Sequence, residues 1–143
     1  MRQTGRQVSR GSERLAARPA ARSARQRRGE LAYHSGLAAE EIVAGDYARR
    51  GFPAAARRWR GLGGEIDIIL RDGDGVIFVE VKKAETHDEA ALRLSRAQLA
   101  RIEASAAEYL DGLPRGALTE CRIDLALVDG AGRVAIIENA SQF

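Results

Sequence analysis

The sequence lacks the features of secreted and membrane-spanning proteins. It contains a single cysteine, Cys121, which excludes an internal disulfide and favours a reducing, cytoplasmic compartment. No apolar run approaches the roughly 18 residues that a bilayer-spanning helix requires, and no apolar stretch follows the N-terminal arginines as it does in a secretory signal. The length of 143 residues suits one domain with a single hydrophobic core. We therefore expect a single-domain protein with no membrane partner.

Residues that often build catalytic sites are also scarce. The two histidines, His34 and His87, have no partners at metal-ligand spacing, so we interpret both as surface or capping residues. Cys121 lies in an apolar, strand-like run, which favours a core thiol over a nucleophile. Trp59 lies among arginines and could stack on a base, but packing on a strand is the simpler interpretation. These residues are therefore weak candidates for a functional site.

Charge is distributed unevenly along the chain, although the formal net charge is only +3. Residues 1–28 carry nine arginines against one acidic residue, Glu13, whereas the other 115 residues have a net charge of −5. We expect residues 1–28 to be a basic, disordered extension and residues 29–143 to be the folded domain. The extension could hold nucleic-acid phosphates without sequence preference. An organelle transit peptide, or an artefact of the start site, would have the same composition.

Hydrophobic periodicity predicts an α/β domain with the element order helix, three strands, helix, two strands, and hence a mixed sheet flanked by helices. The second helix should begin near Thr86, because Thr86 and Glu89 have the spacing of a capping box. Its apolar stripe consists of Leu92, Leu99, Ile102, Ala106 and Leu110. The expected helices are residues 30–50 and 86–112, and the expected strands are 52–60, 64–71, 76–82, 121–128 and 133–137.

The sequence DGDG at 72–75 predicts a hairpin turn between the second and third strands. Residues two apart in a strand share a face, so Glu80 and Lys82 point in the same direction. Each of the three possible two-residue loops also places Asp67 on that face. With residues 73–74 at the tip, Asp67 lies directly across from Glu80, with their Cβ atoms roughly 5 Å apart.

The aliphatic residues of these two strands then share the opposite face, which must be core. They are Ile66, Ile68, Leu70, Ile77, Val79 and Val81. The polar face adds Glu65 to Asp67, Glu80 and Lys82, and carboxylates directly across a ladder repel each other. Either this face is solvated, as in an ordinary hairpin, or a divalent cation such as Mg²⁺ offsets the repulsion. Phe78 shares the polar face, which favours a face that is not fully open to water.

The first predicted helix contains a misplaced charge. Its apolar stripe includes Tyr33, Leu37, Ala44 and Tyr47. At 3.6 residues per turn Glu40 falls in the middle of this stripe, whereas Glu41 falls towards its rim. A carboxylate on a buried stripe is unfavourable unless it is paired or binds a metal ion. A site shared with Asp67 and Glu80 would explain Glu40.

These residues resemble the signature of the PD-(D/E)XK nuclease superfamily, and more narrowly the YraN family of bacterial proteins, which is similar to archaeal Holliday-junction resolvases. The resemblance covers about residues 30 to 140 and excludes the arginine-rich extension. It rests on three motifs: Gly36-x-x-Ala39-Glu40-Glu41, Gly64-Glu65-Ile66-Asp67-Ile68-Ile69 and Phe78-Val79-Glu80-Val81-Lys82. The resemblance implies a restriction-endonuclease-like fold.

The resemblance also implies roles for these residues. Asp67 and Glu80 would be metal ligands for Mg²⁺ or Mn²⁺, with Glu40 as a third carboxylate, and Lys82 would orient the attacking water. Gln98 corresponds to a polar residue that often borders such sites. Family members usually read V-E-V-K-x-R, but Ala84 stands where that arginine would be. Lys83, or the group Arg57, Arg58 and Arg60, would then have to bind the phosphate.

We therefore expect a metal-dependent endonuclease that hydrolyses phosphodiester bonds of nucleic acid, DNA in the first place, and that could act as a homodimer. A non-catalytic nucleic-acid-binding or adaptor module on the same fold is the alternative, and an RNA-directed enzyme is a third. The set Glu40, Asp67, Glu80 and Lys82 favours the enzyme. The missing arginine and the acidic charge of the domain favour the adaptor.

Overall fold

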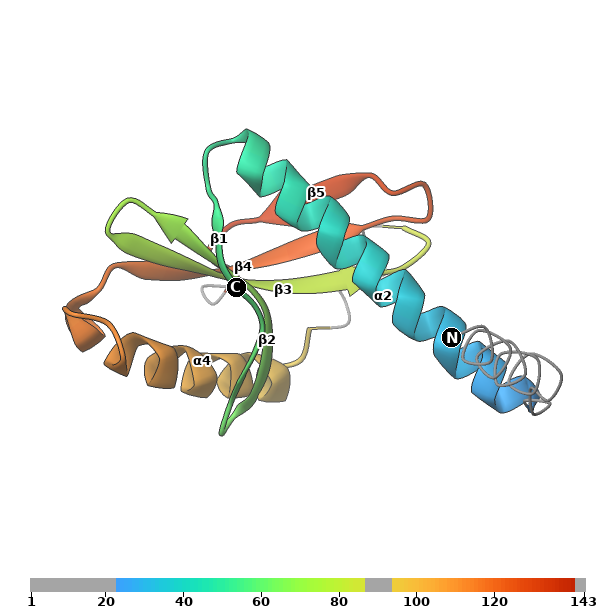
Figure 1. Ribbon diagram of the computed structural model, residues 1–143, viewed down its shortest axis with the longest axis horizontal. Coiled ribbons are helices and arrows are strands. Elements are labelled where there is room, and N and C mark those ends of the chain that lie inside the picture. The colour runs from blue at the N-terminus through green and yellow to red at the C-terminus, as the bar shows by residue number, and fades with distance from the viewer. Residues whose placement is uncertain (1–22, 87–93, 141–143) are drawn as a thin grey trace, which may run out of the picture. The chain divides into compact units, whose positions relative to one another are not determined.

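The computed structural model describes residues 23–86 and 94–140, with the side chains of residues 29–35 left aside (Figure 1). Residues 1–33 and 34–143 form two separate units, and helix α2 (Ala24–Arg49) passes from the first into the second. The helix begins earlier than predicted because Ser23 and Gln26 form a capping box, in which each side chain accepts a hydrogen bond from the other residue's backbone N–H. Residues 24–28 are therefore helical rather than disordered, and the extension that precedes them lies outside the described residues.

Five strands form one mixed sheet in the spatial order β1-β2-β3-β4-β5. All neighbouring strands are antiparallel except β3 and β4, which are parallel and are connected through α4, as a parallel pair requires. The predicted element order and mixed sheet are thus confirmed. The strands are β1 (Ala54–Gly61), β2 (Gly64–Asp72), β3 (Gly75–Lys83), β4 (Cys121–Val128) and β5 (Val134–Ile137).

Helix α4 (Arg96–Asp111) begins ten residues after the predicted start. Its capping box is formed by Ser95 and Gln98: Ser95 Oγ accepts from the Gln98 N–H at 3.1 Å, and Gln98 Oε1 accepts from the Ser95 N–H at 3.1 Å. The prediction that one helix runs from Thr86 to Gly112 was therefore wrong, because residues 94–95, directly before α4, are not helical. Glu89 and Leu92 lie outside the described residues, as does His87.

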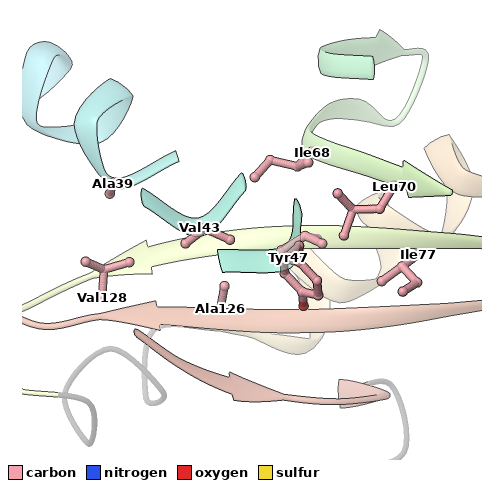
Figure 2. Close-up of a cluster of buried hydrophobic side chains, with 9 residues drawn as sticks. Ala39, Val43, Tyr47, Ile68, Leu70, Ile77, Ala126 and Val128 are labelled. Atoms are coloured by element: carbon pink, nitrogen blue, oxygen red, sulfur yellow. The ribbon is translucent and has the colours of Figure 1, made fainter. Parts of the chain in front are cut away.

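Helices α2 and α4 cover opposite faces of the sheet (Figure 1). On the α2 face, Ala39, Val43 and Tyr47 pack on aliphatic residues of β2, β3 and β4, and Figure 2 shows these side chains converging in one cluster. On the α4 face, Ile102, Ala106 and Leu110 pack with Ile66, Ile69, Val76, Phe78 and Ile123. The predicted stripe of the second helix is confirmed for these three residues. None of the described helices is long and apolar enough to cross a membrane.

The register of the β2–β3 hairpin selects one of the three predicted turns. Asp72 pairs with Gly75, so residues 73–74 form the tip, and Gly73 has the positive φ of 59° that this turn requires. The ladder ends at Ile68 and Val79, one step before Asp67 and Glu80. Beyond this point the alternation of β2 breaks.

The break in β2 changes the face of one predicted core residue. Ile66 is buried on the α4 face, whereas Ile68 and Leu70 are buried on the α2 face. The prediction that all six aliphatics share one face was therefore wrong for Ile66. Strand alternation holds only while the backbone stays in a regular ladder, and β2 leaves β3 at this point to continue beside β1.

Candidate active site

The candidate site lies where β2 diverges from β3. Asp67 is the first residue of β2 beyond the ladder, and its Oδ2 accepts a hydrogen bond of 2.8 Å from the backbone N–H of Val81. This side chain occupies the position that a backbone carbonyl would take in a continued ladder. The divergence of the strands thus places a carboxylate between them and fixes its orientation.

Glu80 lies against Asp67, as the hairpin register predicts. Burial raises the pKa of the Glu80 carboxyl to about 9, with further contributions from a hydrogen bond to Asp67 and from the negative charges of Asp67 and Glu40; Lys82 acts in the opposite direction. A proton on Glu80, hydrogen-bonded to Asp67, replaces the repulsion of two carboxylates. The structure therefore brings Asp67, Glu80 and Lys82 together, and it places Glu40 near enough to act on Glu80.

Glu80 faces a pocket of about 200 Å³ under the N-terminal half of α4. The helix contributes Gln98, Arg101 and Ile102. The β1–β2 turn contributes Gly63, and the start of β2 contributes Gly64 and Glu65. We call this the acidic pocket. Gln98 thus lines the same pocket as Glu80, and its role at the site stays a prediction. Arg101 was missed by the sequence reasoning, although its i,i+3 spacing from Gln98 places both on the same side of the helix.

Glu40 is buried, with 6% of its surface exposed, as its position on the apolar stripe predicts. Its partner is Arg58 of β1: Nε donates to one Glu40 oxygen at 3.0 Å and Nη2 to the other at 3.3 Å. This ion pair explains why a carboxylate is tolerated there. Each Glu40 oxygen accepts one hydrogen bond from Arg58 and keeps a second lone pair.

Arg58 has an unusual backbone conformation, with φ of 52° inside a strand. Consecutive residues of a regular strand point to opposite faces, yet Arg57 and Arg58 both bind consecutive glutamates of α2, Arg57 to Glu41 and Arg58 to Glu40. The left-handed conformation at Arg58 makes this possible. Such a conformation costs on the order of 1–3 kcal/mol in a non-glycine residue and is often found at functional sites.

The carboxylates of the site meet part of what a divalent cation requires. Within the described residues, no three Asp, Glu, His or Cys side chains already form a cluster able to enclose an ion. Asp67 and Glu80 nevertheless provide paired carboxylate oxygens in a partly buried site, which suits Mg²⁺ or Mn²⁺. The pair fits a cation that enters as the Glu80 proton leaves, with water completing its coordination.

The other predicted contacts to nucleic acid have partners within the protein. Arg57, Arg58 and Arg60 each pair with a glutamate, so the structure gives no support to their serving in place of the missing arginine. Lys83 is exposed at the end of β3. Trp59 packs edge-on against Tyr109 with ring centroids 5.3 Å apart, which confirms the packing interpretation.

Cys121 differs from its expected role. It is exposed at the start of β4, so the expectation of a core thiol was wrong. Cys121 is the first residue of the strand, and the buried residues of the strand follow it. Partial burial of the sulfur raises the pKa of the thiol. Cys121 therefore lacks the lowered pKa of a reactive nucleophile. The side chain of His34 lies outside the described part of the chain.

A buried ionic network lies on the α2 face, and sequence reasoning missed it. Asp124 of β4 is fully buried and accepts hydrogen bonds from the Tyr47 hydroxyl at 2.7 Å, Arg122 Nε at 3.0 Å and the Asn139 N–H at 3.0 Å. Burial and the bond to Asp124 raise the pKa of Tyr47. The available signal was an aspartate inside the apolar run CRIDLALV. The network connects α2 to β4 and positions the helix that carries Glu40.

The acidic pocket makes a testable prediction about pH. Because the pKa of Glu80 is raised in the folded protein, the stability it contributes is present below its unfolded pKa and is lost as the pH rises through about 9. In EDTA, the free energy of unfolding of E80Q should equal that of wild type near pH 4.5. Near pH 9 it should be higher than that of wild type by about 1–3 kcal/mol, the equivalent of one or two pKa units. Urea unfolding at both pH values measures this. E65Q, which removes a carboxylate paired with Arg60 in the same pocket, is the control.

The fold and the pocket define a small mixed α/β domain that carries paired carboxylates where two strands of its sheet diverge. A model of the uncharacterised protein family UPF0102 matches residues 39–128, which include every strand except β5 and the whole acidic pocket. The chain belongs to this family.

Curated relatives cover most of the chain. A UPF0102 protein of Cereibacter sphaeroides (strain KD131) is 62% identical over 112 residues, which are 78% of this chain and 96% of the relative. A UPF0102 protein of Ruegeria sp. (strain TM1040) is 53% identical over 79% of this chain and 91% of its own length. A UPF0102 protein of Dinoroseobacter shibae is 50% identical over 81% of this chain and 87% of its own length. The similarity therefore covers about four fifths of this chain.

Proposed function

We propose that this protein is a metal-dependent endonuclease that hydrolyses phosphodiester bonds of nucleic acid, with DNA as the first candidate substrate. The observation that carries the proposal is the Asp67–Glu80 carboxyl pair, held between diverging strands beside Lys82 and open to a pocket with Gln98 and Arg101. The order Glu40, Asp67, Glu80, Lys82 resembles the PD-(D/E)XK signature, as found in YraN proteins and archaeal Holliday-junction resolvases, and supports the same function.

Each residue of the site has a role in this proposal. Asp67 and Glu80 would hold Mg²⁺ or Mn²⁺, which when bound lowers the pKa of water and neutralises charge on the phosphate. The Val81 N–H holds one oxygen of Asp67 and leaves the other free to face the ion. Lys82 orients the attacking water. Arg101 binds a phosphate oxygen from the helix side of the pocket and takes the role of the arginine that Ala84 replaces.

One observation favours a second function. Both oxygens of Glu40 hold Arg58, so the third carboxylate of a nuclease site is occupied within the protein. A non-catalytic nucleic-acid-binding module would keep this arrangement permanently. In a nuclease, by contrast, Glu40 would also act toward the ion through its remaining lone pairs.

A cleavage assay separates the two functions. The full chain is incubated with Mg²⁺ or Mn²⁺ and with linear, flapped and four-way DNA, and with single-stranded RNA for comparison. We expect nicking of at least one DNA that depends on the divalent ion and stops in EDTA. Binding of these substrates without cleavage under any metal condition would support the binding module, and preferential cleavage of RNA would change the substrate class.

Binding of the metal alone should raise the stability of the folded protein. An ion that binds only the folded protein stabilises it by mass action, by about 2.7 kcal/mol at a hundredfold excess over Kd. Millimolar Mn²⁺ should therefore raise the melting temperature at neutral pH, and D67N should reduce this shift. E41Q serves as a control, because Glu41 is exposed and paired with Arg57. An equal shift in wild type and D67N would place the ion elsewhere.

A further inference from the structure

A second cavity lies on the α4 face at the opposite end of the helix from the acidic pocket. Its volume is about 260 Å³, and it lies between the β2–β3 turn, the C-terminal end of α4 and the short helix η1 (Gly116–Leu118) with its flanking residues. Much of its lining is apolar: Ala55, Val76, Tyr109, Leu113 and Pro114. We call it the arginine cavity, after the two basic residues described next.

Arg71 and Arg115 line this cavity. Arg71 follows Ile69 by two residues in β2, so it lies on the α4 face. Neither arginine takes part in an ion pair of the described residues, unlike Arg49, Arg50, Arg57, Arg58, Arg60, Arg122 and Arg133. Asp74 also lines the cavity, which leaves a net charge of +1 among its ionisable residues. Two guanidinium groups without a carboxylate partner in the described part of the chain therefore border one small space.

Thr119 adds a hydrogen-bonding group to the cavity. It is 6% exposed, and its Oγ1 is the only buried side-chain nitrogen or oxygen of the described residues without a hydrogen-bond partner. A buried polar group without a partner is unfavourable, so such groups usually have a ligand or water partner. The turn is held close to this segment, because Val76 N–H donates to the Glu120 carbonyl at 2.9 Å. A Cβ at Gly75 would lie 2.9 Å from the same carbonyl oxygen, so the close approach requires glycine.

We infer that the arginine cavity binds a phosphate ester, and that in the nucleic-acid complex this group is a second phosphate of the strand whose cleaved bond lies in the acidic pocket. Arg71 supplies donors from β2, and Arg115 and Thr119 supply them from the two ends of η1. A tetrahedral phosphate accepts donors from several directions, whereas a planar carboxylate is satisfied by one guanidinium group. The aromatic and apolar lining suits the attached sugar or base. The identity of the strand rests on the proposed function; the anion site does not.

The spacing of the two pockets agrees with one continuous strand. Val76 lines the arginine cavity and Glu80 lines the acidic pocket, four residues apart on β3. Four strand residues span about 13 Å. A duplex strand has one phosphate per roughly 3.4 Å of helix axis, so this distance corresponds to about four nucleotide steps. The arginine cavity would thus position the strand and leave the chemistry to the acidic pocket.

The test begins with the anion site alone. The full chain, ¹⁵N-labelled and without divalent ions, is titrated with adenosine monophosphate, inorganic phosphate or acetate at constant ionic strength. We expect both phosphates, but not acetate, to shift the amide resonances of Gly73, Gly75 and Thr119. R71A/R115A should weaken binding at least about tenfold, the effect of losing one charged hydrogen bond. R49A/R133A removes two exposed arginines elsewhere and should bind as wild type.

A further variant separates ligand binding from folding. T119V keeps the shape of Thr119 and removes a hydroxyl that has no partner in the free protein, so the melting temperature should stay the same or rise. Its affinity for adenosine monophosphate should nevertheless fall. Equal affinity in wild type, R71A/R115A and T119V, or the absence of any phosphate-dependent shift, would overturn the anion site whether or not the protein cleaves nucleic acid.

The second step uses an oligonucleotide and its salt dependence. Removing the contact to this one phosphate should reduce the slope of log affinity against log salt by about 0.7 for a single strand to 0.9 for a duplex. An unchanged slope in R71A/R115A, combined with lost binding of adenosine monophosphate, would overturn the assignment to the same strand. A protein that binds adenosine monophosphate here but never cleaves nucleic acid would retain the anion site and lose only the proposed function.

Discussion

Replacing Glu80 with glutamine is expected to lower metal-dependent cleavage of nucleic acid by at least about a hundredfold, the lower end of the contribution of a positioned catalytic group. Glutamine keeps the size of the side chain and can still bond Asp67, but it carries no charge for the cation. The protein should fold and remain at least as stable without metal, because burial and Asp67 oppose the charged form of Glu80. Nicking rates of the purified variant measure the effect.

Two further variants test whether the loss of cleavage in E80Q arises at the reaction centre. K82A should also abolish cleavage while leaving much of the nucleic-acid binding, because Lys82 acts on the water and phosphate at the reaction centre. E65Q removes a carboxylate from the same pocket that is already paired with Arg60, so it should retain most activity. Cleavage by E80Q at the wild-type rate would mean that the site lies elsewhere or that the activity is a contaminant.

Replacing Asp124 with alanine is expected to give a large loss of stability, about 3–5 kcal/mol, as for removal of one partner of a buried ion pair. Arg122, the Tyr47 hydroxyl and the Asn139 N–H would lose their shared acceptor at once. For a domain of this size the loss corresponds to roughly 10 °C or more in melting temperature. Urea unfolding and calorimetry measure both quantities.

Y47F is the matched control for this network. It removes one hydroxyl and leaves Asp124 with its bonds from Arg122 and Asn139, so the expected loss is smaller, about 1–2 kcal/mol. If D124A were as stable as wild type, the network would contribute nothing to the net stability of the fold. Helix α2 also carries Glu40. In a D124A protein that is destabilised but still folded, the charge of Glu40 should therefore raise the pKa of Glu80 less than in wild type.

Much of the fold follows from local patterns. The alternation in β2 and β3 and the DGDG turn predict the hairpin and its register, and these place Asp67 beside Glu80. The burial of Glu40 follows from helical periodicity. These features depend only on neighbours in the sequence, where side-chain periodicity and turn chemistry determine the geometry.

The features that could not be predicted depend on tertiary contacts. The partner of Glu40 depends on the left-handed conformation of Arg58, which no residue preference indicates because glycine is the usual choice there. The face of Ile66 depends on where the β2–β3 ladder ends. Arg101 borders the site only because α4 crosses the sheet beside Glu80.

The parallel pairing of β3 and β4 also bears on the order of folding. The β1–β2 and β2–β3 hairpins join residues close in sequence, whereas β3 and β4 pair across the whole segment that contains α4. Loop closure makes such distant pairing slow, so we expect the three-stranded meander to form first and β4 to join only as α4 docks. Asp67 and Glu80 belong to the early part, but Gln98 and Arg101 arrive with the late part. A nascent chain would therefore have its carboxylate pair before it has the helix side of its pocket.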